Sequence, residues 1–256
     1  MNAGFPPCFT SLKPFIGLFS AGMPWLMYHK LGPRPRAVRL KGLYVSRPLF
    51  ERQLSELRAA GFATPVCGPP LGEGNPGRRI AITFDDGFAN VFQHGLEPLA
   101  RHGFRAMIFL VAELIGSSNE WEMLEGEARQ SLMNDTQIKE WLAAGHEIGS
   151  HTLTHPFLTR LSLEKAREEI AASKKKLEDR FGRPVRHFCY PYGDWNPAVR
   201  DLVIAAGYET ACTTELGVNT QATPPFELKR IQARYQSVSF KALMQRLGRF
   251  RTAWSS

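Results

Sequence analysis

Two short stretches of the chain hold carboxylates and imidazoles at spacings that suit chemistry. The stretch AITFDDGF places Asp85 beside Asp86, where an apolar run reaches Gly87. The stretch SHTLTHP places His151 and His155 four residues apart, which brings two imidazoles to one side of a helical turn. Two imidazoles and one carboxylate can hold a divalent metal and leave positions open for water and substrate. The second aspartate would then be free to act as a base toward water.

The same residues also allow a purely structural interpretation. Asp85 and Asp86 could cap the following helix, with one of the two histidines buried and the other exposed. Adjacent carboxylates repel each other, however, and a cation beside them removes that cost. The two stretches together at strand ends therefore favour a metal site over the structural alternative.

The elements that must position these side chains alternate along the chain. We expect strands at 25–28, 80–84, 106–111, 147–150, 185–189, 209–213 and 228–232, and helices at 47–60, 91–101, 136–144, 163–181, 197–206 and 240–249. A glycine follows five of these helices, as helix C-termini favour: Gly61, Gly103, Gly145, Gly182 and Gly207. This alternation predicts an α/β fold with a parallel sheet.

Polar residues without an obvious role in the core follow several of these strands. They are His29, Asp85, Asp86, His151, His155, Tyr192, Thr213 and Thr214. In parallel α/β barrels the carboxyl ends of the strands meet on one face, which is where such enzymes place their chemistry. Residues that are scattered over most of the sequence are therefore expected to be neighbours.

The bulk composition is that of an ordinary globular protein. The chain has 256 residues, 43% apolar and 22% charged, which suits one large α/β domain. Its net charge of +8 favours anionic surroundings such as acidic glycans or phospholipid headgroups. No zinc finger or RNA-recognition signature accompanies that charge, so no nucleic-acid partner is expected. The four cysteines form no disulfide framework or zinc knuckle.

The N-terminal part contains one apolar run, residues 15–27. Two glycines and a proline interrupt it, and it is too short to span a bilayer. The run continues directly into a predicted strand, so we expect no cleaved signal peptide and favour a cytoplasmic or peripheral membrane location over secretion. We accordingly divide the chain into an N-terminal extension, 1–23, and one domain, 24–256.

The predicted last helix, 240–249, is basic and amphipathic. Its apolar residues share one face, which usually packs against the rest of the domain. A helix of this kind can also rest on anionic lipid, so peripheral membrane contact is an alternative.

Three short motifs occur along the chain in the same order as in a known protein family. TFDDG, SHTLTH and YPYG (Tyr190–Gly193) resemble those of the polysaccharide deacetylase family, the NodB homology domain of carbohydrate esterase family 4. The resemblance extends from about residue 26 to about residue 232, and AAGHEIGSHTLTH resembles the family over thirteen consecutive residues.

This resemblance implies a fold, a cofactor and a set of site residues. The fold would be a distorted (β/α) barrel of seven or eight units. The cofactor would be a divalent metal, commonly zinc, with cobalt, nickel or iron as alternatives. By match of motif, Asp86, His151 and His155 would be metal ligands and Asp85 the general base. The backbone N–H of Tyr192 would help to hold the oxyanion.

The chain departs from the family pattern at the usual partner of the base. Many members have an arginine two residues before the proline of the third motif, where this chain has Cys189. Arg230, in LKRIQ on the last predicted strand, could reach the same face and take its place. An exposed arginine on a strand is the alternative.

A second departure concerns the general acid. Family members often carry a late Leu-x-His motif, but no histidine follows His187 here. His29, in LMYHKL, resembles the early Met-Tyr-His segment of a subgroup whose first strand precedes the TFDDG strand, and it is our candidate. A hydrogen-bonded structural histidine is the alternative. We expect His146 to be structural and to lie at the opposite end of the barrel.

These expectations combine into a metal-dependent hydrolase that removes N-acetyl or O-acetyl groups from a polysaccharide or glycoconjugate. The expected partner is a glycan, which could be lipid-linked or anionic. Alternatives with the same fold are a deformylase of a lipid-linked aminosugar, an amidohydrolase of a cyclic amide, and a glycan-binding domain without catalysis. An iron oxygenase would use the same ligands, typically on a different β scaffold.

Overall fold

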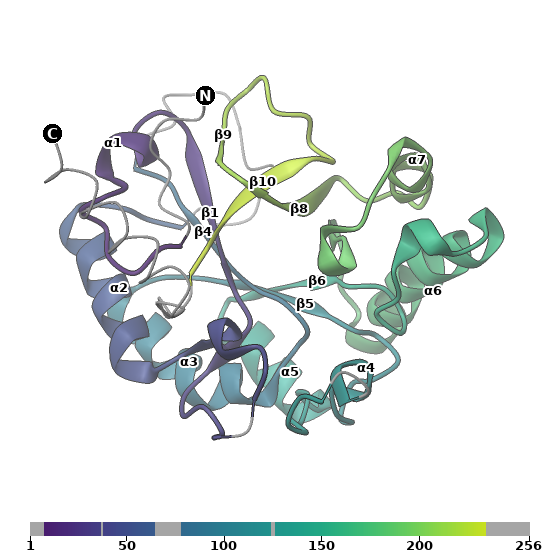
Figure 1. The fold of residues 1–256 in the computed structure, drawn as a ribbon, viewed down its shortest axis with the longest axis horizontal. Helices are drawn as coiled ribbons and strands as arrows, with labels where there is room; N and C mark the ends of the chain where they lie inside the picture. The colour runs from purple at the N-terminus through teal and green to yellow at the C-terminus, as the bar shows by residue number, and fades with distance from the viewer. Residues whose placement is uncertain (1–7, 37, 65–77, 124–125, 234–256) are drawn as a thin grey trace, which may run out of the picture.

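Seven parallel strands close into a barrel in this computed structural model, which describes residues 8–36, 38–64, 78–123 and 126–233. The strands are β1 (Met23–Tyr28), β4 (Ala81–Phe84), β5 (Met107–Leu110), β6 (Glu147–Ser150), β7 (His187–Cys189), β8 (Thr210–Leu216) and β10 (Leu228–Gln232). They follow the order β10-β8-β7-β6-β5-β4-β1, and β10 pairs with β1 to complete the closure (Figure 1). The predicted barrel is confirmed, with seven strands.

Helices surround this barrel (Figure 1). They are α2 (Arg47–Ala59), α3 (Ala89–His102), α5 (Asp135–Ala143), α6 (Leu163–Phe181) and α7 (Pro197–Ala205), each close to its predicted bounds. The five glycines that follow them all have a left-handed φ, between 63° and 83°, as helix ends favour. The predicted helix at 240–249 lies outside the described residues.

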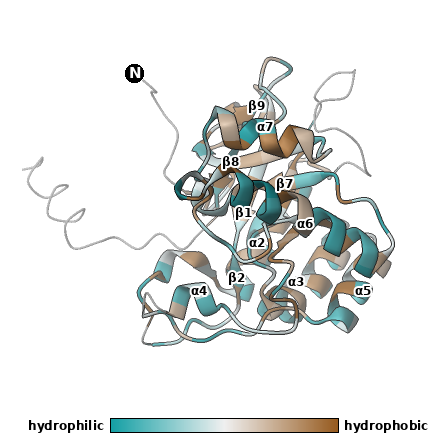
Figure 2. Ribbon diagram, turned by 90° about the vertical axis from the view of Figure 1, so that its right-hand side faces the viewer, coloured by the Kyte–Doolittle hydropathy of each residue, from teal (hydrophilic) through white to brown (hydrophobic). Residues whose placement is uncertain are grey.

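The core has two layers because successive strand residues point to opposite faces. Tyr28 and Phe84 belong to the larger cluster, which includes Phe50 of α2 and Trp141 of α5. A smaller cluster gathers residues from five strands of the barrel: Met23, Trp25, Phe109, Cys189, Cys212 and Leu228. α5 and α6 carry both hydrophilic and hydrophobic residues (Figure 2), as expected of helices with one face on a core.

Two excursions between strands and helices were not predicted. The first follows β1 and contains β2 (Lys30–Leu31), the short helix η1 (Lys41–Leu43) and β3 (Tyr44–Val45); β2 and β3 pair in parallel. The second lies between β5 and α5 and contains α4 (Glu120–Met123). Both excursions leave the barrel at the carboxyl ends of strands, so they can wall the face where chemistry is expected.

The described part of the N-terminal segment, residues 8–22, packs on the barrel. Phe15 and Phe19, which bracket helix α1 (Ile16–Phe19), contact Phe9, and Phe19 meets Phe62 edge to face with the ring centroids 5.6 Å apart. The backbone N–H of Phe9 donates to the carbonyl of Gln232 at 2.7 Å. This segment therefore contacts both Phe62, which follows α2, and the last residue of β10. In the part of the chain that the structure describes, no helix is long and apolar enough to cross a membrane.

Candidate active site

A cavity of about 180 Å³ opens at the carboxyl ends of the strands. Its lining residues are His29, Leu40, Leu43, Asp85, Asp86, Trp121, Glu122, His151, His155, Tyr190, Tyr192 and Thr214. Six of the seven predicted site residues are among them. The seventh, Arg230, contacts Asp85 from β10. Residues that are up to 201 positions apart in sequence, from His29 to Arg230, are thus brought to one place.

The backbone at this cavity is strained. Within the described residues, four residues other than glycine have a positive φ: Asp86 at 73°, Thr152 at 69°, His155 at 68° and Tyr192 at 60°. Such a conformation costs about 1 to 3 kcal/mol and persists only where the surroundings enforce it. All four belong to the three motifs of the site. The rest of the fold therefore enforces an unfavourable backbone conformation at these four residues, and this conformation sets the direction of their side chains.

Asp86, His151 and His155 converge on one point. The Nε2 atoms of both histidines lie 3.3 Å from the same atom, Oδ1 of Asp86, and all three side chains are at most 5% exposed. The Nδ1–H of His151 donates to the carbonyl of Cys189 at 2.7 Å, so its other ring nitrogen, Nε2, faces Asp86. The hydroxyl of Thr152 accepts the backbone N–H of His155 at 3.0 Å and holds the loop between the histidines.

A divalent cation fits this arrangement. Donor atoms about 2.0 to 2.1 Å from one tetrahedral ion lie about 3.3 Å from each other, which is the separation from Oδ1 of Asp86 to each Nε2 atom here. A cation shared by two imidazole nitrogens and a carboxylate oxygen would also compensate the charge of the buried carboxylate. Burial alone would raise the pKa of Asp86, but its contacts with His151 and His155 hold that pKa well below its ordinary value.

Asp85 is held by Arg230, as the sequence suggested. Nη1 and Nη2 of the guanidinium donate to the two carboxylate oxygens at 2.7 and 2.8 Å. The remaining donors of Arg230 reach the carbonyl of Thr213, the hydroxyl of Thr83 and the sulfur of Cys189. Although burial opposes it, the charge of Arg230 holds the pKa of Asp85 below its ordinary value. Asp85 is thus fixed as an ionised, oriented carboxylate.

A second set of close donor atoms consists of Asp85, His151 and Cys189. Arg230 already occupies both oxygens of Asp85, and Nδ1 of His151 is bonded to a carbonyl. Burial raises the pKa of the Cys189 thiol to about 11, so the thiol keeps its proton near neutral pH. This set is therefore the weaker of the two for a metal.

His29 and Tyr192 also line the cavity. Nε2 of His29 lies 3.8 Å from Oδ2 of Asp85, and the side chain is 20% exposed. The Tyr192 ring stacks on Phe157 with a centroid separation of 3.8 Å and meets the His155 ring edge to face at 4.6 Å. His29 therefore has access to both solvent and the proposed base.

Sequence reasoning missed several residues of the cavity wall. Trp121, on α4, stacks on the His155 ring with the centroids 4.7 Å apart. Its neighbour Glu122 forms a buried ion pair with Lys30 of β2 at 2.6 Å. Burial and then the charge of Asp86 raise the pKa of Glu122. These residues belong to the two unpredicted excursions, where the sequence has no hydrophobic periodicity from which the position of a side chain could be predicted.

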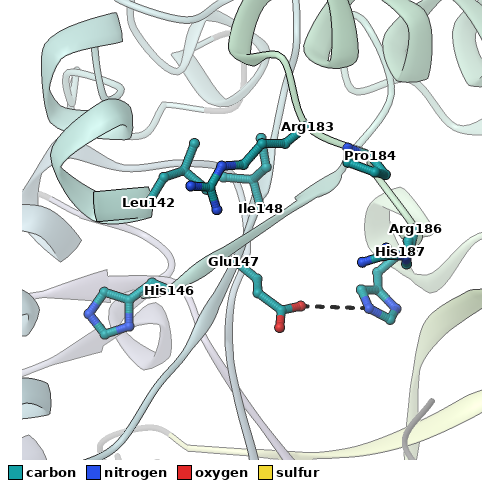
Figure 3. Close-up of a pocket in the computed structure, with 8 residues that line it drawn as sticks. All are labelled: Leu142, His146, Glu147, Ile148, Arg183, Pro184, Arg186 and His187. Atoms are coloured by element: carbon teal, nitrogen blue, oxygen red, sulfur yellow. Dashed lines mark ion pairs between the residues drawn. The ribbon is translucent and has the colours of Figure 1, made fainter. Parts of the chain in front are cut away.

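A second cavity, of about 230 Å³, lies at the amino ends of β6 and β7 (Figure 3). Its lining includes His146, Glu147, Arg183 and His187. His146 is buried and contacts Trp141 with the two tilted rings' centroids 4.2 Å apart, and its Nδ1 accepts the backbone N–H of Ala106. As expected from the sequence, His146 is at the end of the barrel opposite the TFDDG and SHTLTH motifs.

Comparison with known proteins places these features in a family. The family model described as polysaccharide deacetylase matches residues 72–211. YxkH of Bacillus subtilis, which carries the name of a polysaccharide deacetylase, is 26% identical over 83% of this chain and 71% of its own length. The structure of a polysaccharide deacetylase from Bacillus cereus superposes with a TM-score of 0.72 at 25% identity, covering 88% of this chain and 68% of that one.

A peptidoglycan N-acetylglucosamine deacetylase of Listeria monocytogenes is 28% identical over 67% of this chain. The chain spans only 32% of the length of that relative. The span that the family model matches, residues 72–211, contains all three motifs of the site in this chain.

Proposed function

Because the chain belongs to the polysaccharide deacetylase family, hydrolases of carbon–nitrogen bonds other than peptide bonds, we propose that it is a metal-dependent deacetylase that removes N-acetyl groups from aminosugars of a glycan. The observation that carries this proposal is the convergence of both Nε2 atoms on one oxygen of Asp86, beside an aspartate held by a guanidinium. One carboxylate is thereby available to a metal and the other to a proton.

Asp86, His151 and His155 are the residues that would hold the ion. Its donor set favours zinc, with cobalt, nickel or iron as alternatives. When bound, a divalent ion of this kind supplies Lewis acidity, which polarises an acyl carbonyl and makes water more acidic.

Asp85 is the general base in this proposal. Its carboxylate accepts a proton from the water that attacks the acetyl carbon, and Arg230 keeps the accepting oxygens oriented. Tyr192 borders the same cavity, and we assign its backbone N–H to the oxyanion that forms at the acetyl oxygen. Collapse of that oxyanion breaks the carbon–nitrogen bond and releases acetate.

His29 is the proposed general acid. The departing nitrogen must gain a proton to leave as an amine, and His29 reaches the cavity within 3.8 Å of Asp85. The side chain of His29 is 20% exposed, so the ring can regain a proton from solvent after it gives one. Arg230 acts through Asp85 and is a positioning residue.

The proposal is tested by acetate release from N-acetylglucosamine oligomers with added zinc or cobalt. The Asp85→Asn variant should lose at least about 1000-fold in kcat while it keeps the wild-type metal content, because the ligand set is intact and the base is absent. Turnover that is unchanged in this variant would remove the base assignment.

The released acid separates the competing functions. Formate in place of acetate would indicate a deformylase, and ring opening without a released acid would indicate action on a cyclic amide. One metal ion per chain without hydrolysis across a glycan panel would indicate a glycan-binding domain. Metal content and released acid are therefore measured on the same preparation.

A further inference from the structure

A buried ion pair stands in the wall of the catalytic cavity. Lys30 is fully buried, Glu122 is 6% exposed, and Nζ of Lys30 lies 2.6 Å from Oε2 of Glu122. Nδ2 of Asn119, also fully buried, donates to the same oxygen at 2.6 Å. Removing two charges from water is costly, and a pair of hydrophobic residues would often be as stable. A pair kept at such a place is a candidate for function.

The two oxygens of Glu122 have different surroundings. Oε2 accepts from Lys30 and from Asn119. Oε1 accepts no hydrogen bond from the residues that the structure describes. It is also not one of the fully buried polar atoms without a partner, so a molecule in the cavity can reach it. Glu122 lines the cavity together with Asp86 and His155. One oriented acceptor is therefore left for a molecule in the cavity.

We propose that Glu122 recognises the sugar ring that carries the acetamido group, by accepting a hydrogen bond from one of its hydroxyls. This assignment rests on the proposed function. A carboxylate oxygen only accepts, so it selects a donor. Lys30 neutralises the charge of Glu122, so the pair offers no net attraction for an ammonium group and suits a neutral hydroxyl. Lys30 and Asn119 are positioning residues that fix the direction of Oε1.

The geometry of the wall supports a ring-binding role. Trp121, next to Glu122 on α4, stacks on the His155 ring. The same helix thus contacts a proposed metal ligand and carries the unused acceptor. A substrate whose acetyl group lies at His151 and His155 has its sugar ring beside this wall, where a hydroxyl close to the acetamido nitrogen can reach Glu122.

The test removes both charges together, with the double variant Lys30→Met and Glu122→Met, because removal of one partner would leave a buried charge. Substrates are an N-acetylglucosamine oligomer and analogues in which single hydroxyls are replaced by hydrogen. Wild type should lose about 10- to 100-fold in kcat/KM on one deoxy analogue, as expected for a hydrogen bond to a charged group. The double variant should lose a similar factor on the parent oligomer and little more on that analogue.

This coupling between residue and hydroxyl is a readout that a merely structural pair would not give. If the double variant loses the same additional factor on every analogue as wild type does, the assignment is wrong. Metal content per chain and melting temperature are measured alongside, and a changed metal content would overturn the assignment by placing the effect on the ligands.

A matched control is the pair Lys174 and Glu178 on α6, joined at 2.7 Å and remote from the cavity lining. Its double variant to methionine should leave the parent and deoxy rates unchanged. If wild type hydrolyses no oligomer, the proposed function fails. The dissociation constants of the same analogues then decide the role of Glu122, with the same expected coupling in wild type and double variant.

Discussion

The two ends of the barrel carry similar side chains in very different arrangements. The carboxyl end has His151, His155 and two aspartates with an arginine, and the amino end has His146, His187 and Glu147 with Arg183 and Arg186 (Figure 3). At the carboxyl end both imidazoles direct Nε2 to one oxygen. At the amino end Nδ1 of His146 accepts from Ala106, and Nδ1 of His187 is 2.7 Å from the Thr210 hydroxyl. The amino-end imidazoles do not converge.

The backbone explains this difference. Asp86, Thr152, His155 and Tyr192 adopt left-handed conformations, whereas none of the residues named at the amino end does so. Side chains on regular strands point alternately in and out, so a regular strand rarely aims neighbours at one atom. The strained turns after β4, β6 and β7 remove that restriction. Similar residues alone therefore do not form a convergent site. The strained backbone at the strand ends is what directs the side chains to one point.

The largest predicted effect on stability comes from breaking the Asp85–Arg230 pair of the carboxyl end. Arg230→Ala leaves a buried carboxylate without its partner, which should destabilise the fold by about 3 to 5 kcal/mol. The activity of the folded protein should fall by on the order of 100-fold, because Asp85 loses both donors that orient it. Urea unfolding and acetate release measure the two effects.

A second variant supplies the lost guanidinium from β7, at position 189, in place of β10. Nη2 of Arg230 lies 3.1 Å from Sγ of Cys189, so an arginine at position 189 enters the space that Arg230→Ala vacates. The double variant Arg230→Ala with Cys189→Arg should recover at least half of the lost unfolding free energy. Recovery of stability and activity would show that the guanidinium matters and not the strand it comes from. If neither stability nor activity recovers, positions 189 and 230 are not interchangeable sources of the guanidinium, and this prediction is wrong.

Much of the carboxyl end was predictable from the sequence because its signals are local. Asp85 and Asp86 follow an apolar run, and the two histidines are four residues apart. Parallel strands bring such ends together, which also made Arg230 of β10 a candidate. Lys30 and Glu122 were not predictable, since they are 92 residues apart and come from excursions without periodicity. The resemblance to a family marked the motifs but not this wall.

A smaller effect concerns the pH dependence of stability at the amino end. Burial and then the charge of Arg105 lower the pKa of His146 to about 4. The unfolded chain, with an ordinary histidine pKa near 6.5, binds the proton more strongly, so this group contributes stability above pH about 6.5 that is lost as the pH falls toward 4. Between pH 7 and 4.5 the loss amounts to about 2 kcal/mol.

His146→Asn tests this contribution. The asparagine oxygen can replace Nδ1 as acceptor for Ala106, but it does not titrate. Urea unfolding at pH 7 and 4.5 should show a loss of stability on acidification that is smaller in the variant by about 2 kcal/mol. An equal loss in both proteins would mean that His146 is protonated in the fold. Activity at pH 7 should be unaffected, which separates this histidine from those of the carboxyl end.

The smallest effect is expected for the carboxylate of the amino end. The side chain of Glu147 is 31% exposed and lies 3.7 Å from Nε2 of His187, whose pKa burial lowers, so the contact joins a carboxylate to a neutral imidazole near pH 7. Exposed pairs of this kind contribute little. Glu147→Gln should change the unfolding free energy by less than about 0.5 kcal/mol and leave acetate release at the wild-type rate. A loss of activity like that of Asp85→Asn would mean that chemistry occurs at both ends, and the contrast between strained and regular strand ends would not hold.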